Sequence, residues 1–208
     1  MVALNLLSEI ITSEFDYNIL QYVLRGYRFP RNKIRNLMAD SEIIRVKKGL
    51  YVKGDSSYSP QVLAGMIYGP SYVSQHYALS LYGLIPERVH IVTSMSLGRR
   101  KRFETPVGVF TYEPLTERLF AFGVRRFEVS PTQPYLIASP EKAIVDIIWK
   151  RRDLDTPAAL EPYLLDDMRL DLDQRDLFSL RRMRQLERAY GKRPVTALTA
   201  ILTARLNA

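Results

Sequence analysis

The pattern of apolar positions in the first 55 residues predicts three short helices followed by a β-hairpin. Apolar residues recur at helical spacing in LNLLSEII, and Asp16 is placed to cap a second helix, YNILQYVL, that ends at Gly26. Pro30 suits the first turn of a third helix that runs to Ala39. The segment EIIRVKKGLYVK then indicates two strands joined at Gly49, where a tight turn needs a positive φ.

The pattern changes after Gly54, where GDSSYS is typical of a short linker. Helices are expected in QVLAGMIY and in SQHYALSLYG, the second capped by Ser74 and ended by Gly83. Alternating segments then predict strands over residues 90–95, 108–115, 122–129 and 134–139. A helix follows at EKAIVDIIWKR, and helices are expected from residue 156 to the end. The fold class is therefore α+β, with one domain over residues 1–55 and a second over residues 56–208; the role of the tail after Asp153 stays open.

The net charge of +8 is concentrated in one short part of the chain. Residues 25–53 contain nine basic and two acidic side chains, whereas the remainder contains 21 basic and 20 acidic ones. A localised basic patch of this kind favours a polyanionic partner such as nucleic acid. The alternative is a basic face that is merely solvated.

The third helix separates its apolar and polar residues cleanly. On a helical wheel Ile34, Leu37 and Met38 share one side, and the opposite side carries asparagine and arginine, which match the hydrogen-bonding edges of adenine and guanine in the major groove. Three helices and a hairpin with a basic tip indicate a winged helix-turn-helix, with the third helix in the groove and the tip against phosphate. The predicted DNA-binding residues are Arg28, Arg31, Asn32, Lys33, Arg35, Asn36, Arg45, Lys47 and Lys48. Because one such unit contacts few base pairs, two-fold assembly of the protein on inverted repeats is expected.

A second basic cluster lies between two predicted strands. Four consecutive cations follow Gly98, two more fall on the next predicted strand, and Phe103 is placed to stack on a base. The loop is either a solvated surface, a second DNA contact, or an RNA or toxin-related contact. This second basic patch comprises Arg99, Arg100, Lys101, Arg102, Arg125 and Arg126.

The residues that could support catalysis do not form a known motif. The sequence contains no HExxH, P-loop, GxSxG or dinucleotide fingerprint and no cysteine, and a lone histidine such as His76 or His90 is more often a packed or surface residue than a ligand. We therefore expect no catalytic residue, no metal site and no cofactor. A metal-dependent nuclease in the second domain is the enzymatic alternative.

Two acidic segments bear on that alternative. Glu141, Lys142 and Asp146 weakly resemble a metal-nuclease set, but a Ser-Pro-Glu helix start explains them as capping and complementarity to the helix dipole. In DDMRLDLDQRD the nearby arginines oppose cation binding, so Asp171 and Asp173 are expected in a solvated turn where Asp173 caps the next helix. Tyrosines at near-helical spacing from residue 68 to 82 are expected to form a core stripe.

Several blocks of the sequence, taken in order, resemble the AbiEi-type antitoxins of type IV toxin–antitoxin systems. The blocks are RNKIRNLMADSEIIRVKKGLYV, YGPSYVSQHYALSLYGLIPE, VTSMSLGRRKRFETPVGVFTY and ASPEKAIVDII, and the resemblance spans roughly residues 15–149. It implies a winged-helix domain joined to a larger antitoxin domain, repression of the protein's own operon at inverted repeats, and defence against phage. It also implies counteraction of a nucleotidyltransferase-like toxin without a stable complex. Carried over by position, the operator contacts would be Arg31, Lys33, Arg35, Lys47 and Lys48. A transcription factor without a toxin is the remaining alternative.

The expected location is the cytoplasm. No apolar run reaches the roughly 18 to 20 residues that cross a bilayer, and the N-terminal segment lacks the basic start of a signal peptide. The lack of cysteine agrees with a reducing compartment. No membrane contact is therefore expected.

Overall fold

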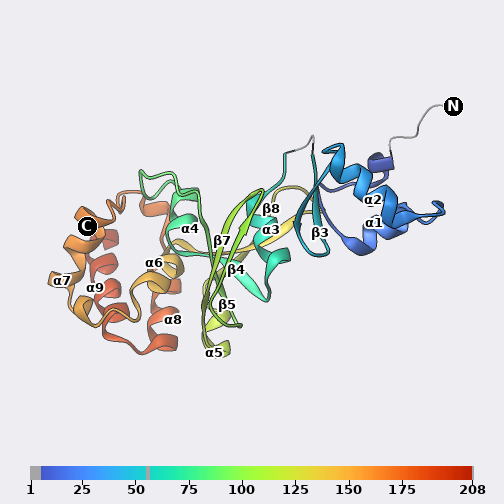
Figure 1. Ribbon diagram of the computed structural model, residues 1–208. Helices are drawn as coiled ribbons and strands as arrows, with labels where there is room; N and C mark the ends of the chain where they lie inside the picture. Colours follow the sequence, from blue (N-terminus) through green and yellow to red (C-terminus); the bar gives the residue numbers. More distant parts are fainter. Residues whose placement is uncertain (1–5, 55–56, 208) are drawn as a thin grey trace.

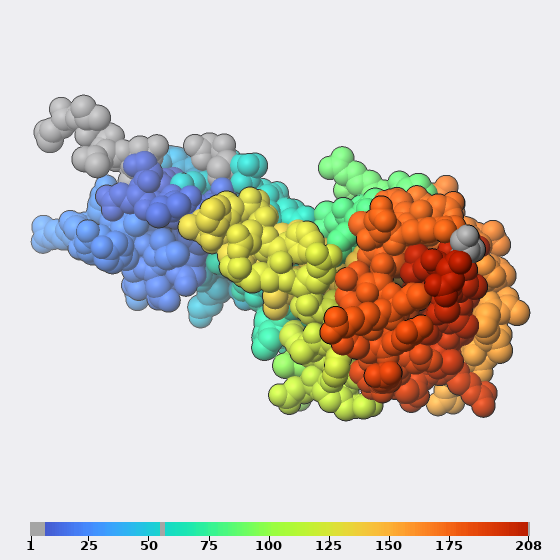
Figure 2. Space-filling model, turned by 180° about the vertical axis from the view of Figure 1, so that it is seen from behind, coloured from blue at the N-terminus to red at the C-terminus, as the bar shows by residue number. Residues whose placement is uncertain are grey.

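A computed structural model describes residues 6–54 and 57–207 and shows an elongated α+β protein (Figure 1). A small N-terminal unit lies at one end, a six-stranded sheet lies in the middle, and a helical lobe lies at the other end. Figure 2 shows the same elongation from behind, with the C-terminal helices forming the broad end. No helix in the two described ranges has the length and apolar character needed to cross a membrane.

The N-terminal unit contains two helices and a three-stranded sheet. Asp16 caps the first helix by accepting a hydrogen bond from the Ile19 amide at 3.0 Å, Pro30 occupies the first turn of the second helix, and Gly49 has φ +83° in the hairpin turn, all as predicted. The helix expected in LNLLSEII is a short 3-10 turn within the described residues. The elements are this turn (Leu6–Glu9), β1 (Glu14–Asp16), α1 (Tyr17–Val23), α2 (Pro30–Ala39), β2 (Ile43–Lys47) and β3 (Leu50–Lys53).

The small sheet lies between two hydrophobic cores. Its strands are antiparallel in the order β1-β3-β2. Ile43 and Tyr51 pack in the small core together with Leu37 of α2, whereas Leu50 and Val52 belong to the large core of the rest of the protein. The hairpin therefore joins the two units by burying a different set of side chains on each side. The predicted boundary at residues 55 and 56 lies outside the described residues.

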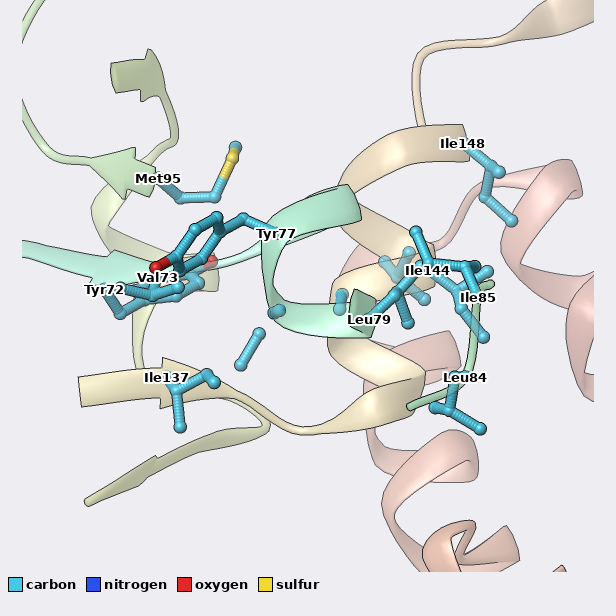
Figure 3. Packing of buried hydrophobic residues seen from close by; sticks show 14 of the residues in the cluster. Tyr72, Val73, Tyr77, Leu79, Leu84, Ile85, Met95, Ile137, Ile144 and Ile148 are labelled. Carbon is cyan, nitrogen blue, oxygen red and sulfur yellow. The ribbon is translucent and has the colours of Figure 1, made fainter. Parts of the chain in front are cut away.

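The second unit is built on a mixed sheet with the strand order β6-β7-β5-β4-β9-β8. Residues of α4 and α6 pack together beside the sheet, with Leu79 and Ile144 among the buried contacts (Figure 3). Four strands match the predicted segments, whereas β4 and β6 were not predicted. The elements up to α6 are α3 (Pro60–Ile67), β4 (Ser71–Val73), α4 (Gln75–Leu81), β5 (Val92–Ser96), β6 (Lys101–Thr105), β7 (Gly108–Pro114), α5 (Glu117–Phe120), β8 (Val124–Glu128), β9 (Pro134–Ala138) and α6 (Pro140–Ile148).

The tail after Asp153 completes the large core. Met183 and Leu186 of α8 and Leu198 of α9 are buried in the same cluster as the residues of α6. The tail therefore covers α6 and belongs to the second unit. The tail elements are a 3-10 turn (Arg152–Leu154), α7 (Pro157–Pro162), a π-helical turn (Tyr163–Asp167), a 3-10 turn (Arg175–Leu177), α8 (Leu180–Tyr190) and α9 (Arg193–Asn207).

Two local expectations were wrong. Asp173 caps no helix within the described residues, because Gln174 precedes the next 3-10 turn and Ser179 caps α8 by accepting from the Arg182 amide. The tyrosines expected as one helical stripe are divided among elements, because the short strand β4 interrupts the helical spacing and contains Tyr72. Each of these tyrosines still packs in or against the large core.

The buried tyrosines predict a loss of stability at alkaline pH. Burial raises the pKa of Tyr72, Tyr112 and Tyr190 above the usual range, and it raises the pKa of Tyr82 to about 12. Between pH 10 and pH 12 the unfolded chain loses these phenolic protons while the folded chain keeps them. The free energy of unfolding should therefore fall as the pH rises, by up to about 1.4 kcal/mol per pH unit for each such tyrosine, and this contribution is fully present below pH 10.

Urea unfolding at several pH values from 9 to 11 measures this slope. Tyr112→Phe should make the slope less steep, since it removes one buried phenol, whereas Tyr22→Phe should leave it unchanged because Tyr22 is 65% exposed. Equal slopes for wild type and the Tyr112→Phe variant would contradict the prediction.

Candidate nucleic-acid interface

The second helix of the N-terminal unit, α2, presents a polar face to solvent. Its inner side is anchored by Ile34 and Leu37, both buried, and by Met38, which packs against the same small core. One turn of helix has 3.6 residues, so fixing these positions leaves the opposite side pointing outward. The residues on that exposed side are Arg31, Asn32, Arg35 and Asn36. The structure thus brings these four predicted DNA-binding residues together on one surface, with Lys33 half-buried at its margin.

The positive charge of this unit is not neutralised internally. Across residues 6–54, none of the predicted DNA-binding cations forms a salt bridge with a carboxylate. Arg28 is exposed next to the start of α2, with its guanidinium carbon 5.2 Å from the ring centroid of Phe29. Arg45 on β2 is also exposed. These side chains are free to meet external anions, and the field around α2 is correspondingly positive.

The two lysines at the hairpin turn point in different directions. Lys48 is exposed beside Gly49, as expected for the tip. Lys47, however, is half-buried and donates a hydrogen bond to the backbone carbonyl of Ile67 in the second unit, and burial lowers the pKa of its ammonium group. The pairing register shifts between Arg45 and Lys47, and such a bulge re-aims the following side chain. Lys47, which the sequence assigned to phosphate, thus makes a contact between the two units.

A buried carboxylate missed by the sequence interpretation also joins the units. Glu14 of β1 is 3% exposed and accepts hydrogen bonds from the Ser59 amide and from the side chain of Gln133. A buried charge needs such partners to offset its loss of hydration. No local signal in the sequence marks Glu14, because its partners are 45 and 119 positions away. Glu14 and Lys47 together tie the small sheet to the second unit.

The predicted second basic patch is not one surface. β6 and β8 form opposite edges of the six-stranded sheet, so β7, β5, β4 and β9 separate Arg99–Arg102 from Arg125 and Arg126. The two groups of cations lie near neighbouring predicted strands along the chain. They are far apart in the sheet, because the strands are arranged in a different order there. Phe103 packs against the rings of Tyr68 and Tyr112 and is not free to stack on a base.

Carboxylates neutralise part of this charge. Arg100 pairs with Glu113 at 2.7 Å and Arg102 with Glu104 at 3.0 Å, and Arg126 pairs with Glu128. Arg99 and Lys101 are exposed, and Arg125 lies over the ring of Phe127 at 5.1 Å. Three of the six cations therefore form salt bridges with carboxylates, whereas the predicted DNA-binding cations of the N-terminal unit form none within residues 6–54.

The residues considered for a nuclease lie inside the second unit. Glu141 is fully buried and bonds to Arg182 at 3.1 Å and to the Ser179 amide. The Lys142 ammonium is also fully buried and lies 2.8 Å from the Asp146 carboxylate. Ser139 caps α6 by accepting a hydrogen bond from the Lys142 amide at 3.4 Å, and Glu141 lies in the first turn, so the helix-start interpretation is confirmed; Glu141 also contacts the tail. Within residues 6–54 and 57–207, no group of three or more histidine or carboxylate side chains is arranged to hold a metal ion.

The two histidines remain outside any such network. His76 and His90 are both exposed to solvent. Although His76 as a whole residue is exposed, partial desolvation of its ring lowers its pKa, and the Glu87 carboxylate opposes this shift. The chemistry that stands out on the described surface is therefore the polar and cationic face of α2 with the nearby hairpin tip.

No family model matches the sequence, and a search of curated proteins found no significant relative.

Proposed function

We propose that the protein is a DNA-binding regulator whose N-terminal unit is a winged helix-turn-helix. The observation that carries this proposal is the outer face of α2, where Asn32, Arg35 and Asn36 are exposed on a helix whose opposite side is buried. An α-helix fits the major groove of B-DNA, and the asparagine and arginine side chains of α2 can pair bidentately with adenine and guanine. The element order of two helices followed by a hairpin supports the same assignment.

The hairpin takes the role of the wing in this proposal. Lys48 and Arg45 are exposed and carry no internal ion pair within the part of the unit that the structure describes, so they are the candidates for phosphate contacts beside the groove. We do not assign this role to Lys47, because its ammonium donates a hydrogen bond to the Ile67 carbonyl. α2 would thus select the sequence, and the wing would add affinity for any duplex.

The wider role that we propose is that of an antitoxin that represses its own operon. This part is supported by the ordered resemblance to AbiEi-type antitoxins. The operator would contain inverted repeats bound by two copies of the protein. The protein would counteract a nucleotidyltransferase-like toxin encoded beside it, and this would not require a stable complex between the two proteins. A neighbouring reading frame without a nucleotidyltransferase would contradict the antitoxin part and leave the DNA-binding part standing.

The direct test is binding of the purified protein to DNA upstream of its gene, compared with an unrelated duplex at several salt concentrations. Lys48→Ala should weaken binding to both duplexes alike and reduce the salt slope of log K by about one unit, because one phosphate contact is lost. Lys47→Ala is the matched control and should leave the slope unchanged, since its ammonium already bonds to Ile67. Equal changes in slope for the two variants would contradict the assignment of the wing tip.

A further inference from the structure

A cationic hollow is lined by residues that follow α6 and residues at the start of α9. These elements belong to the helical lobe, which lies at the opposite end of the molecule from α2 (Figure 1). The volume of the hollow is about 400 Å³, within the roughly 300 to 1,000 Å³ typical of small-molecule sites. Two segments that are far apart in sequence form its walls: residues 149–152 with Asp155 after α6, and residues 192–194 at the start of α9. The packing of the tail on α6 therefore creates this hollow.

The walls carry an excess of positive charge. Five of the lining side chains are basic and one is acidic. Arg193 pairs with Asp155 at 3.3 Å, and Arg151 pairs with Asp153 at 2.6 Å. The three other lining cations have no carboxylate partner in the described ranges; they are Lys150, Arg152 and Lys192. α9 also begins at Arg193, so the positive end of a 15-residue helix dipole lies on the same wall.

An aromatic side chain stands beside these cations. Trp149 lines the hollow and is held by an edge-on contact with Tyr190, with ring centroids 5.7 Å apart. The Lys150 ammonium lies 4.6 Å from the Trp149 ring centroid. A half-buried indole next to unpaired cations offers a stacking surface and phosphate ligands within one site.

We propose that this hollow binds a nucleoside di- or triphosphate. Lys150, Arg152 and Lys192 hold the phosphate groups, and the base lies against Trp149. Arginine suits this role because its planar guanidinium pairs bidentately with phosphate oxygens. An extended nucleic acid would instead favour a long cationic track, whereas these three cations line a single hollow from two segments. The site is separate from the proposed DNA interface and does not depend on it.

Trp149 is the only tryptophan in the chain, so its fluorescence reports on this hollow. The full-length protein is titrated with ATP, GTP and inorganic pyrophosphate, with calorimetry as a second readout. Saturable binding of a nucleotide, tighter than that of pyrophosphate, is the expected result. The double variant R152A/K192A should bind at least about tenfold more weakly, since it loses two charge-assisted contacts. The control R181A/R184A removes the same charge from exposed positions of α8 and should bind as wild type does.

Three results would overturn the proposal. The first is no fluorescence change and no heat with any of the three ligands. The second is equal weakening in R152A/K192A and R181A/R184A, which would show a general effect of net charge. The third is tight binding of a single-stranded oligonucleotide at this site with no binding of free nucleotides, which would show a nucleic-acid surface. Operator binding measured on the same variants distinguishes failure here from failure of the proposed DNA-binding function.

Discussion

Asp146→Ala is expected to lower the free energy of unfolding by about 3 to 5 kcal/mol, the typical cost of leaving a buried charge without its partner. The Asp146 carboxylate accepts four hydrogen bonds: from Tyr72 at 2.9 Å, Ser74 at 2.7 Å, Lys142 at 2.8 Å and Tyr190 at 2.9 Å. The donors come from four places in the fold: Tyr72 lies in β4, Ser74 directly precedes α4, Lys142 lies in α6, and Tyr190 is the last residue of α8. Removing the carboxylate takes one acceptor from three hydroxyls and leaves the buried Lys142 ammonium with no anionic partner, only the Leu119 carbonyl and the Tyr190 hydroxyl.

The ammonium accounts for most of this expected loss, and a second variant isolates it. Burial lowers the pKa of Lys142, with Asp146 opposing the shift, so the pair is what keeps this lysine charged. Asp146→Asn should be strongly destabilising, whereas the double variant K142M/D146N should be more stable than Asp146→Asn alone, because no unpaired charge remains. Urea unfolding measures these three variants and the single variant K142M, which completes the double-mutant cycle. Asp176→Ala, at an exposed position, should change the free energy of unfolding by less than about 0.5 kcal/mol. Additive effects of the two substitutions would rule out the coupling.

The local features of the fold were predictable from the sequence because they depend on neighbouring residues. Asp16 as a cap, Pro30 in a first turn and Gly49 at positive φ were all confirmed. The strands that were missed lack such signals. β4 has only three residues, and β6 carries charged side chains on an edge of the sheet, as edge strands do to avoid pairing with other chains, so it resembles a loop in sequence.

The candidate site was predictable only where a single helix determines it. The buried and exposed sides of α2 follow from helical periodicity, and Ile34 and Leu37 are buried as expected. The orientation of the Lys47 side chain depends on the bulge in β2 and on its hydrogen bond to the Ile67 carbonyl, which is 20 positions away in the sequence. The split of the second basic patch depends on strand order, which no local pattern reveals. Ser74 shows the same limit: it occupies the predicted cap position of α4, but its hydroxyl bonds to Asp146.

The triple variant N32A/R35A/N36A is expected to lose operator binding by more than about 100-fold, while its affinity for an unrelated duplex changes little. Each base contact by such a side chain contributes about 1 to 3 kcal/mol of discrimination. Non-specific affinity should persist because Arg31 and Lys48 remain available to phosphates. The fold should persist as well, since all three side chains are exposed and alanine is the strongest helix former.

The control for this variant is R184A/N207A, which removes one arginine and one exposed asparagine from the C-terminal helices. It carries the same change in net charge, so any general effect of charge on DNA binding appears in both variants. Binding is measured by titration of both duplexes at two salt concentrations. If the triple variant binds the operator as wild type does, the proposal that α2 lies in the major groove is wrong. Equal weakening on operator and unrelated DNA would instead make α2 a general phosphate-binding surface, because only contacts with base edges distinguish one sequence from another.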